Sequence, residues 1–428
     1  MAMEKITRSN FYFRFTYGLT ALALATLPFT RALIGPIAVA MLLLLIIDNR
    51  WKENFNSLKS NNLLPFVIIS SAIFLTSLIG TLYSQNTSKA ISDWEYKFLF
   101  FAFPLCIFPI IDNISIKQFR TLIVIFCSAT LSVALINFVI SAIFFARTGD
   151  SQQFFYIYAT HLPLKHHTHP SYLSMYACVN WVMAAYFLIK SEAEGRWEKI
   201  IFWLCLFIFP IDIFLMNSKA GILIFGIFLL TIIVLLINRK RKRTVLTISV
   251  MLACLALALG GILYLWKTNE GRIGHALNSL MTANYDNPYD GTSQRVVVWK
   301  TALELSLENL PMGVGSGDVD NTLFQRYQES GYTGLFAKKL NCHNQYLQNF
   351  LGTGLIGLGV ILLFLIYPLV WAKKRRDFLL ASFILIIGFN MLVESMLEIH
   401  AGTDFISLMY ALLAARSAVK PIECKRSA

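Results

Sequence analysis

Long apolar runs separated by short polar segments occupy most of the 428-residue chain. A helix rises about 1.5 Å per residue, so roughly 20 apolar residues suffice to cross about 30 Å of hydrocarbon. The runs are continuous and lack the alternation of membrane β-barrel strands. The pattern predicts an all-α polytopic membrane protein with about twelve transmembrane helices, at residues 15–30, 33–48, 64–83, 98–111, 121–146, 171–189, 200–216, 220–237, 245–266, 347–371, 378–397 and 405–415.

Two connections on the predicted outer face are long, and the one at 267–346 is the only stretch with the composition of a soluble protein. It contains a candidate amphipathic helix at 295–307 and a turn-rich stretch at 313–317. We divide the chain into transmembrane helices one to six at residues 1–200, a unit at 201–400 that includes this loop, and the last helix with a basic tail at 401–428.

Composition and charge narrow the class and set the orientation. Hydrophobic residues make up 56% of the chain and charged residues 14%, against about 25% charged residues in soluble proteins. With the N-terminus inside, the short inner segments hold 24 of the 37 Lys and Arg residues, which predicts cytoplasmic termini in a bacterial inner membrane. The first apolar run resembles a signal peptide but is long and lacks a clear cleavage site, so we expect a retained helix. The net charge of +13 is spread over these segments, which argues against a nucleic-acid partner.

The segment from His343 to Gly357 carries the most informative pattern. If it is helical, His343, Leu347, Phe350, Gly354 and Gly357 share one stripe, with the histidine at the outer mouth and glycines that allow close packing. A neutral imidazole there can take a proton near pH 7. The alternative is a histidine that only caps a helix or forms hydrogen bonds at the interface. The adjacent Cys342 does not form a pair with it, because neighbouring helical residues diverge.

Four motifs in order resemble those of bacterial O-antigen ligases. The histidine segment matches the family signature, in which His and Asn are followed by nine residues, Gly, two residues and Gly. The other three are Ser-Lys-Ala-Gly at 218–221, similar to the usual Ser-Arg-x-Gly, Ser-x-Arg-x-x-x-Trp at 293–299, and a proline-led Gly-x-Gly turn at 309–317. The resemblance covers roughly residues 210–400.

The resemblance implies a metal-independent, GT-C-like glycosyltransferase that works without a cofactor. Such an O-antigen ligase takes a glycan from undecaprenyl diphosphate and transfers it, on the periplasmic face, to a hydroxyl of lipid A core. O-antigen polymerases and protein O-oligosaccharyltransferases belong to the same superfamily, so the acceptor stays open. We expect inversion by single displacement, because no outer carboxylate is an obvious nucleophile.

Donor chemistry of this kind needs a base and fixed positive charge at the membrane boundary. We expect His343 to be the general base and Arg295 a bidentate ligand of the diphosphate. Lys219 is a second candidate, with charge but no planar fork, and Lys97 is a third. The alternative for these basic residues is a solvated face or an interaction with membrane lipid phosphates.

Three further polar residues are candidate substrate-binding residues. Asn344 follows the histidine, His169 is expected to line the donor entrance, and Glu394 lies where the eleventh helix emerges. An ionisable residue such as Glu394 near a membrane span is a functional candidate, either orienting His343 or neutralising an arginine. Purely structural pairing with Arg or Lys is the alternative.

A metal site and a transporter are two alternatives to this interpretation. The histidines at 161–169 and the Asp318-Val-Asp320 tripeptide suggest a metal, but spacing alone does not supply enough ligands, and a solvated loop or helix cap is the simpler interpretation. Twelve helices also describe secondary transporters. The hydropathy shows neither an internal two-fold repeat nor a helix clearly broken near the midplane, and the large outer loop favours an enzyme.

Overall fold

The computed structural model describes residues 2–150, 154, 157–158, 170–216, 218–237 and 291–419, and the regular structure in these residues is entirely helical. The predicted all-α class is therefore confirmed. The helices are α1 (Ala2–Thr26), α2 (Ile34–Asp48), α3 (Trp51–Ser60), α4 (Leu64–Thr81), α5 (Thr87–Lys97), α6 (Leu99–Ile107), the 3₁₀ turn η1 (Phe108–Asn113), α7 (Ile116–Thr148), α9 (Pro170–Lys190), α10 (Arg196–Leu215), α11 (Lys219–Ile237), α14 (Gly291–Glu308), α15 (Val319–Glu329), α16 (Thr333–Lys338), α17 (Gln345–Arg375), α18 (Phe378–Val393), η2 (Met396–Glu398) and α19 (His400–Ala418).

Each predicted span coincides with a helix or a helix pair, except the one at 245–266, which lies outside the described residues. Five helical segments in the described part of the chain are long and apolar enough to cross a membrane, and a sixth is the pair α2 and α3, bent by 110°. The other helices are shorter or more polar. The membrane-protein class thus has direct support, while the number twelve stays a prediction.

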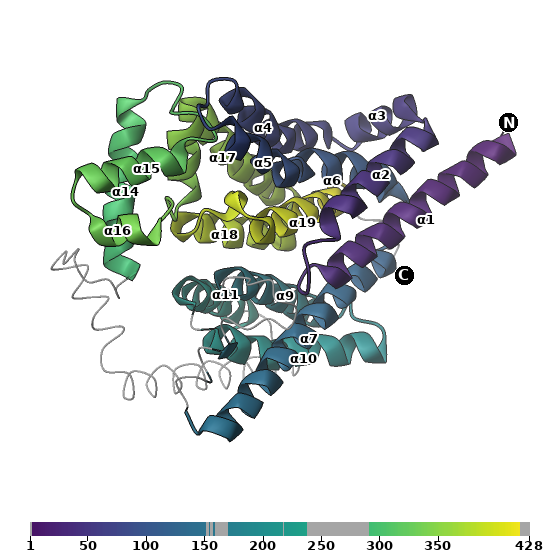
Figure 1. Cartoon of the computed structure of the whole chain (residues 1–428). Coiled ribbons are helices and arrows are strands. Elements are labelled where there is room, and N and C mark those ends of the chain that lie inside the picture. Colours follow the sequence, from purple (N-terminus) through teal and green to yellow (C-terminus); the bar gives the residue numbers. More distant parts are fainter. Residues whose placement is uncertain are drawn as a thin grey trace.

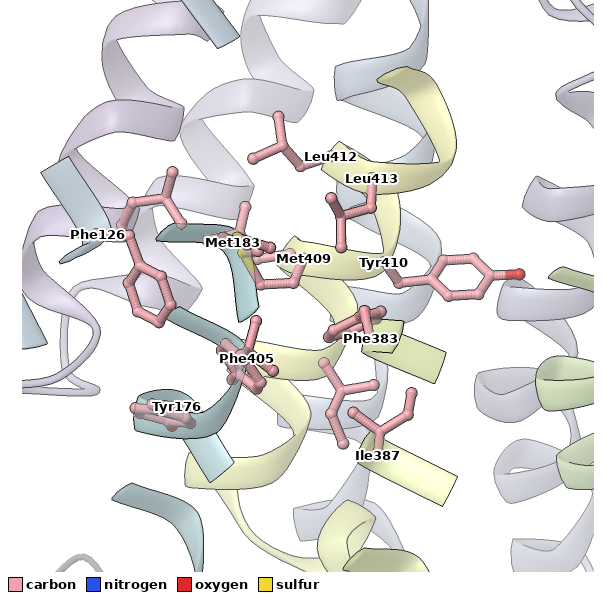
Figure 2. Packing of buried hydrophobic residues seen from close by; sticks show 14 of the residues in the cluster. Phe126, Tyr176, Met183, Phe383, Ile387, Phe405, Met409, Tyr410, Leu412 and Leu413 are labelled. Carbon is pink, nitrogen blue, oxygen red and sulfur yellow. The ribbon is translucent and has the colours of Figure 1, made fainter. Parts of the chain in front are cut away.

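Helix α19 forms the centre of the bundle. Residues 401–415 are buried on every face, which is the pattern of a helix surrounded by protein. Figure 2 shows Phe405 and Met409 of this helix packing against Tyr176 and Met183 of α9, with Phe383 of α18 close by. The predicted last span is therefore a core helix in contact with other helices.

The two ends of the bundle collect different segments of the chain. At one end Arg416 pairs with Asp377 at 3.1 Å and lies over the Phe119 ring, while Arg120 pairs with Glu198 at 2.7 Å. All of these come from segments or helix ends predicted to lie inside. Helices α14, α15 and α16 lie at one end of the molecule, and the first residues of α1 lie at the opposite end (Figure 1). This arrangement supports the predicted alternation of inner and outer segments.

The described part of the predicted outer loop, from residue 291, is folded. Helix α14 buries Val298 and Ala302 in a small hydrophobic core shared with Leu323 and Tyr327 of α15 and Leu351 of α17. The predicted helix at 295–307 is thus confirmed within α14. This second core fixes the loop helices to the start of α17.

Helix α17 is interrupted near its beginning. Thr353 and Gly354 leave helical geometry, and Gly354 adopts φ 64° and ψ −148°, a region open essentially to glycine alone. The amides of Val314 and Gly315 donate to the carbonyls of Leu351 and Gly352 at 2.8 and 2.9 Å. The glycine turn therefore supplies hydrogen bonds at the break, as backbone near a membrane requires.

Candidate active site

Three residues selected from the sequence meet at the end of the bundle that carries α14. Glu394, at the end of α18, accepts a hydrogen bond from Nη2 of Arg295 at 2.6 Å through one carboxylate oxygen. Its other oxygen lies 3.0 Å from Nδ1 of His343. The Glu394 side chain is only 7% exposed, against 28% for Arg295 and 24% for His343. A buried carboxylate thus holds a histidine and an arginine that both reach the surface.

This geometry decides which ring nitrogen of His343 can act as a base. A carboxylate can only accept, so a proton on Nδ1 points at Glu394 and leaves the lone pair on Nε2. Ser171 of α9 also contacts Glu394, with its hydroxyl 3.5 Å from the carboxylate oxygen shared with Arg295. Both roles considered for Glu394, orienting the histidine and neutralising an arginine, are compatible with the same contacts.

His343 lies outside the helix, which corrects the predicted helical stripe. Helix α17 begins at Gln345, and His343 has a φ of 42°, in the left-handed region. Its amide donates to Oδ1 of Asn341 at 3.0 Å, and its carbonyl accepts from the Trp299 indole at 3.2 Å. The predicted stripe is wrong because Asn344 is the N-cap residue of α17, and His343 precedes this cap.

Arg295 and Trp299 lie four residues apart on α14 and therefore on one face of that helix. Trp299 packs against the small core, and its indole donates to the His343 carbonyl and so positions that backbone. The Nε of Arg295 is buried and has no hydrogen-bond partner among the described residues. The guanidinium thus keeps a donor beyond the bond to Glu394.

The remaining candidates have different surroundings. Asn344 caps α17, with its side-chain oxygen accepting from the amides of Tyr346 and Leu347 at 2.9 and 3.1 Å. Lys219 is exposed at the start of α11. Gly221, in the same turn, packs so tightly on Ser174 of α9 that a Cβ would lie 2.6 Å from its hydroxyl. Helices α9 and α11 therefore begin side by side. The remaining candidate, His169, lies outside the described residues.

Lys97 belongs to a second polar cluster. This lysine is the last residue of α5, and its Nζ lies 3.1 Å from Glu398 and 3.9 Å from Asp93. Gln345 donates to the other Glu398 oxygen at 3.1 Å and accepts from the Leu397 amide at 2.6 Å. The charge of Lys97 is thus already balanced by carboxylates, unlike that of a lysine held ready for a phosphate.

The Asp318-Val-Asp320 tripeptide is neither a solvated loop nor a cap of its own helix. Asp318 is buried and accepts from the backbone amides of Gln85 and Asn86, at 2.6 and 2.9 Å, ahead of α5. Burial, followed by the charge of Glu398, raises the pKa of Asp320. Burial also raises the pKa of the Cys342 thiol well above its usual value, in keeping with an inert cysteine.

These features define a class: an all-helical protein with membrane-spanning helices and a histidine, carboxylate and arginine site at one end of the bundle. Residues 202–362 match the family model described as O-antigen ligase. Over this segment the chain is similar to the O-antigen ligase family, and the predicted resemblance is confirmed. Among curated proteins, none matches the chain. The matched segment includes Lys219, Arg295 and His343, whereas Glu394 lies beyond it.

The residues that the sequence did not single out are those that hold the histidine. Asn341 and Ser171 contact the site through the backbone of His343 and the carboxylate of Glu394. A short polar side chain in a loop or at a helix start is too common to be selected from one sequence. For Trp299, the spacing of four from Arg295 was the available signal.

Proposed function

We propose that this protein is a membrane glycosyltransferase of the ligase type. It transfers a glycan from undecaprenyl diphosphate to a hydroxyl of lipid A core on the periplasmic face of the inner membrane. The observation that carries the proposal is the contact of Glu394 with both His343 and Arg295. His343 and Arg295 lie in the segment that matches the O-antigen ligase family.

The proposed reaction is a single displacement. Nε2 of His343 takes the proton of the acceptor hydroxyl, while the oxygen of that hydroxyl bonds to the anomeric carbon of the donor glycan. The bond from that carbon to the diphosphate oxygen breaks, and undecaprenyl diphosphate leaves with the electron pair. Attack opposite the leaving group inverts the anomeric centre.

Fixed positive charge is proposed to stabilise the leaving group. Arg295 contributes its guanidinium, on a side chain that is 28% exposed, and Lys219 contributes a second charge from the exposed start of α11. Cations already held in place stabilise developing charge without reorganisation, so the proposed mechanism requires no metal. Glu394 stabilises the imidazolium that forms and prevents the arginine from turning away.

The test is transfer in vitro from a purified undecaprenyl diphosphate glycan to lipid A core. We expect His343→Ala to lower kcat by roughly 10²-fold or more, and Arg295→Ala by roughly 10- to 10³-fold. Arg326→Ala is the matched control, because Arg326 lies in the same loop, is also 28% exposed and also pairs with a glutamate at 2.6 Å. That variant should keep its activity within about threefold, the effect of a surface ion pair being small.

The outcomes separate the alternatives. Wild-type transfer that survives EDTA and is lost in both site variants supports the ligase and its two residues. Lengthening of a lipid-linked glycan without transfer to lipid A core makes the protein a polymerase, and transfer to a protein hydroxyl makes it an O-oligosaccharyltransferase. Full activity of His343→Ala removes the general base, whichever acceptor is used.

A further inference from the structure

A polar pocket is built in part from the two chain segments that also carry the histidine site, residues 343–353 and 394–398. It is formed by the outer end of α4, the segment before α15, the first two turns of α17 and residues 397–398. Its empty space, mouth included, is about 370 Å³, and its inner part admits only groups the size of a water or a hydroxyl. The lining residues are mostly neutral and polar: Thr76, Ser77, Ser316, Gln345, Gln348, Asn349 and Thr353.

Two buried side chains in the wall of this pocket lack hydrogen-bond partners within the described residues. Ser77 is 4% exposed and Gln348 is 7% exposed, and neither the serine hydroxyl nor the glutamine Oε1 has a protein partner. A buried polar atom left unpaired costs about 1–3 kcal/mol, so such atoms normally bond to a ligand or to water. One can donate and the other can only accept, and a sugar hydroxyl can satisfy both.

The charges around the pocket disfavour an anion. Lys97 faces it in a pair with Glu398, and Asp93 lies between Lys97 and Lys89, 2.6 Å from the latter. Asp320 of α15 adds a third carboxylate within electrostatic range of all four groups. Three carboxylates and two lysines sum to a negative charge when all are ionised. The cluster therefore offers no net positive charge to a diphosphate, and a neutral hydroxyl-bearing group does not need one.

The pocket and the site share their supports. Gln345, which reaches the pocket, follows His343 by two residues, and its side chain bonds to the Leu397 amide and to Glu398. The short segment from Glu394 to Glu398 thus carries the partner of the histidine at one end and a wall of the pocket at the other. The pocket and the base are therefore carried by the same two short segments of the chain.

We propose that this pocket binds a hydroxyl-bearing sugar residue of one of the two glycan substrates, while the arginine and histidine site handles the diphosphate and the proton. The proposal rests on the proposed glycan transfer, and it gives Lys97 the role of holding a pocket wall. The sugar belongs either to the donor glycan or to the acceptor, and the experiment has one arm for each.

The first measurement needs no transfer. The purified full chain in nanodiscs is titrated with two lipid-free probes: core oligosaccharide released from lipid A by mild acid, and donor glycan released from its carrier. We expect one probe to bind, and the Ser77→Ala/Gln348→Leu double variant to weaken its binding about tenfold or more, since each hydrogen bond contributes about 2- to 10-fold. Ser141→Ala is the matched control, because Ser141 on α7 is also buried with an unpaired hydroxyl and does not line the pocket.

The second measurement is steady-state transfer with the same variants. Loss of binding that is equal in the ground and transition states raises KM for one substrate and leaves kcat unchanged. A wild type that transfers glycan while the double variant shows unchanged KM and unchanged probe binding overturns the pocket and leaves the ligase function standing. The proposal is also overturned if neither probe binds to the wild type. Probe binding that the double variant loses, in a protein that transfers nothing, supports the pocket and removes the proposed transfer.

Discussion

At the scale of single residues, Glu394 is the group on which the histidine site depends. Its carboxylate is buried and contacts two side chains from other parts of the chain, His343 and Arg295. Breaking such a pair from one side leaves an uncompensated charge, and this costs more than the pair contributes when intact. The coupling between Glu394 and Arg295 is therefore measurable as stability, independently of any activity.

A double-mutant cycle tests this coupling. We expect Arg295→Met and Glu394→Gln each to destabilise the protein, and the double variant to be more stable than the sum predicts by roughly 1–2 kcal/mol. Thermal unfolding in detergent provides the measurement. The cycle of Arg326→Met and Glu308→Gln serves as the control, and this exposed pair should show no measurable coupling. Additive effects at Glu394 and Arg295 would contradict the contact.

Asp320 gives a pH-dependent prediction at the same scale. Because burial and the neighbouring Glu398 raise its pKa in the folded protein, the folded state binds this proton more tightly than the unfolded state. The free energy of unfolding therefore increases as the pH falls through the raised pKa of Asp320. Above that pKa the ionised carboxylate destabilises the folded protein. Asp320→Asn should raise Tm by roughly 2 °C at about pH 8 and lose that advantage near pH 4. A constant difference between the two pH values would refute the assignment.

At the scale of elements, the interruption of α17 explains why two glycines occur where they do. A Cβ at Gly354 would lie 1.9 Å from the Pro311 carbonyl oxygen, and one at Gly313 would lie 2.4 Å from the Leu351 carbonyl oxygen. Both residues also have positive φ angles, 64° and 75°. The loop before α15 and the start of α17 are thus joined backbone to backbone, which leaves no room for a side chain at either position.

Alanine substitutions in α17 test this explanation. Gly354→Ala must move the loop that docks on the break, so we expect loss of folded protein or destabilisation by several kcal/mol. Gly359→Ala lies later in the same helix with nothing within 4 Å of the new Cβ, and it should be neutral or more stable by about 0.5–1 kcal/mol. Yield of monodisperse protein and Tm are the measurements. Equal yield and equal Tm of the two variants would show that the break does not require glycine at position 354.

At the scale of the whole molecule, the described residues place Arg416, Asp377, Phe119 and Arg120, all predicted to lie inside, at one end of the bundle. The loop helices α14 to α16 dock at the second end, where the histidine site and the polar pocket also lie. The Arg416, Asp377 and Phe119 contacts fix the first end. We predict that the histidine site and the polar pocket face the outer side of the membrane.

Cysteine labelling in cells tests this sidedness. In a background with Cys254 and Cys424 replaced by Ser, the five cysteines of the described chain are buried and should not react. Gln325→Cys on α15 should react with a membrane-impermeant maleimide added outside the inner membrane. Lys199→Cys, exposed at the start of α10, should react only after permeabilisation. The reverse pattern would invert the topology and move the site to the cytoplasm.

The sequence by itself determined the class of the protein and most of its helices. Length and apolarity of a run are local properties, and they decide whether a helix can reside in a membrane without reference to the rest of the chain. Short motifs with local spacing also pointed to His343 and Arg295 and to the ligase family. The Asn cap at 344 and the break at 353–354 could not be read in this way, because a long apolar run looks the same with or without an interruption.

The tertiary structure decided which of the candidates act together. Glu394 contacts His343 across 51 residues and Arg295 across 99, and Lys97 contacts Glu398 across 301. Such separations depend on how helices pack, and packing among apolar surfaces leaves little trace in a single sequence. Only the fold therefore distinguishes Arg295 from Lys97. Arg295 shares a carboxylate with the histidine and is 28% exposed, whereas Lys97 is 10% exposed and its charge is balanced beside a separate pocket.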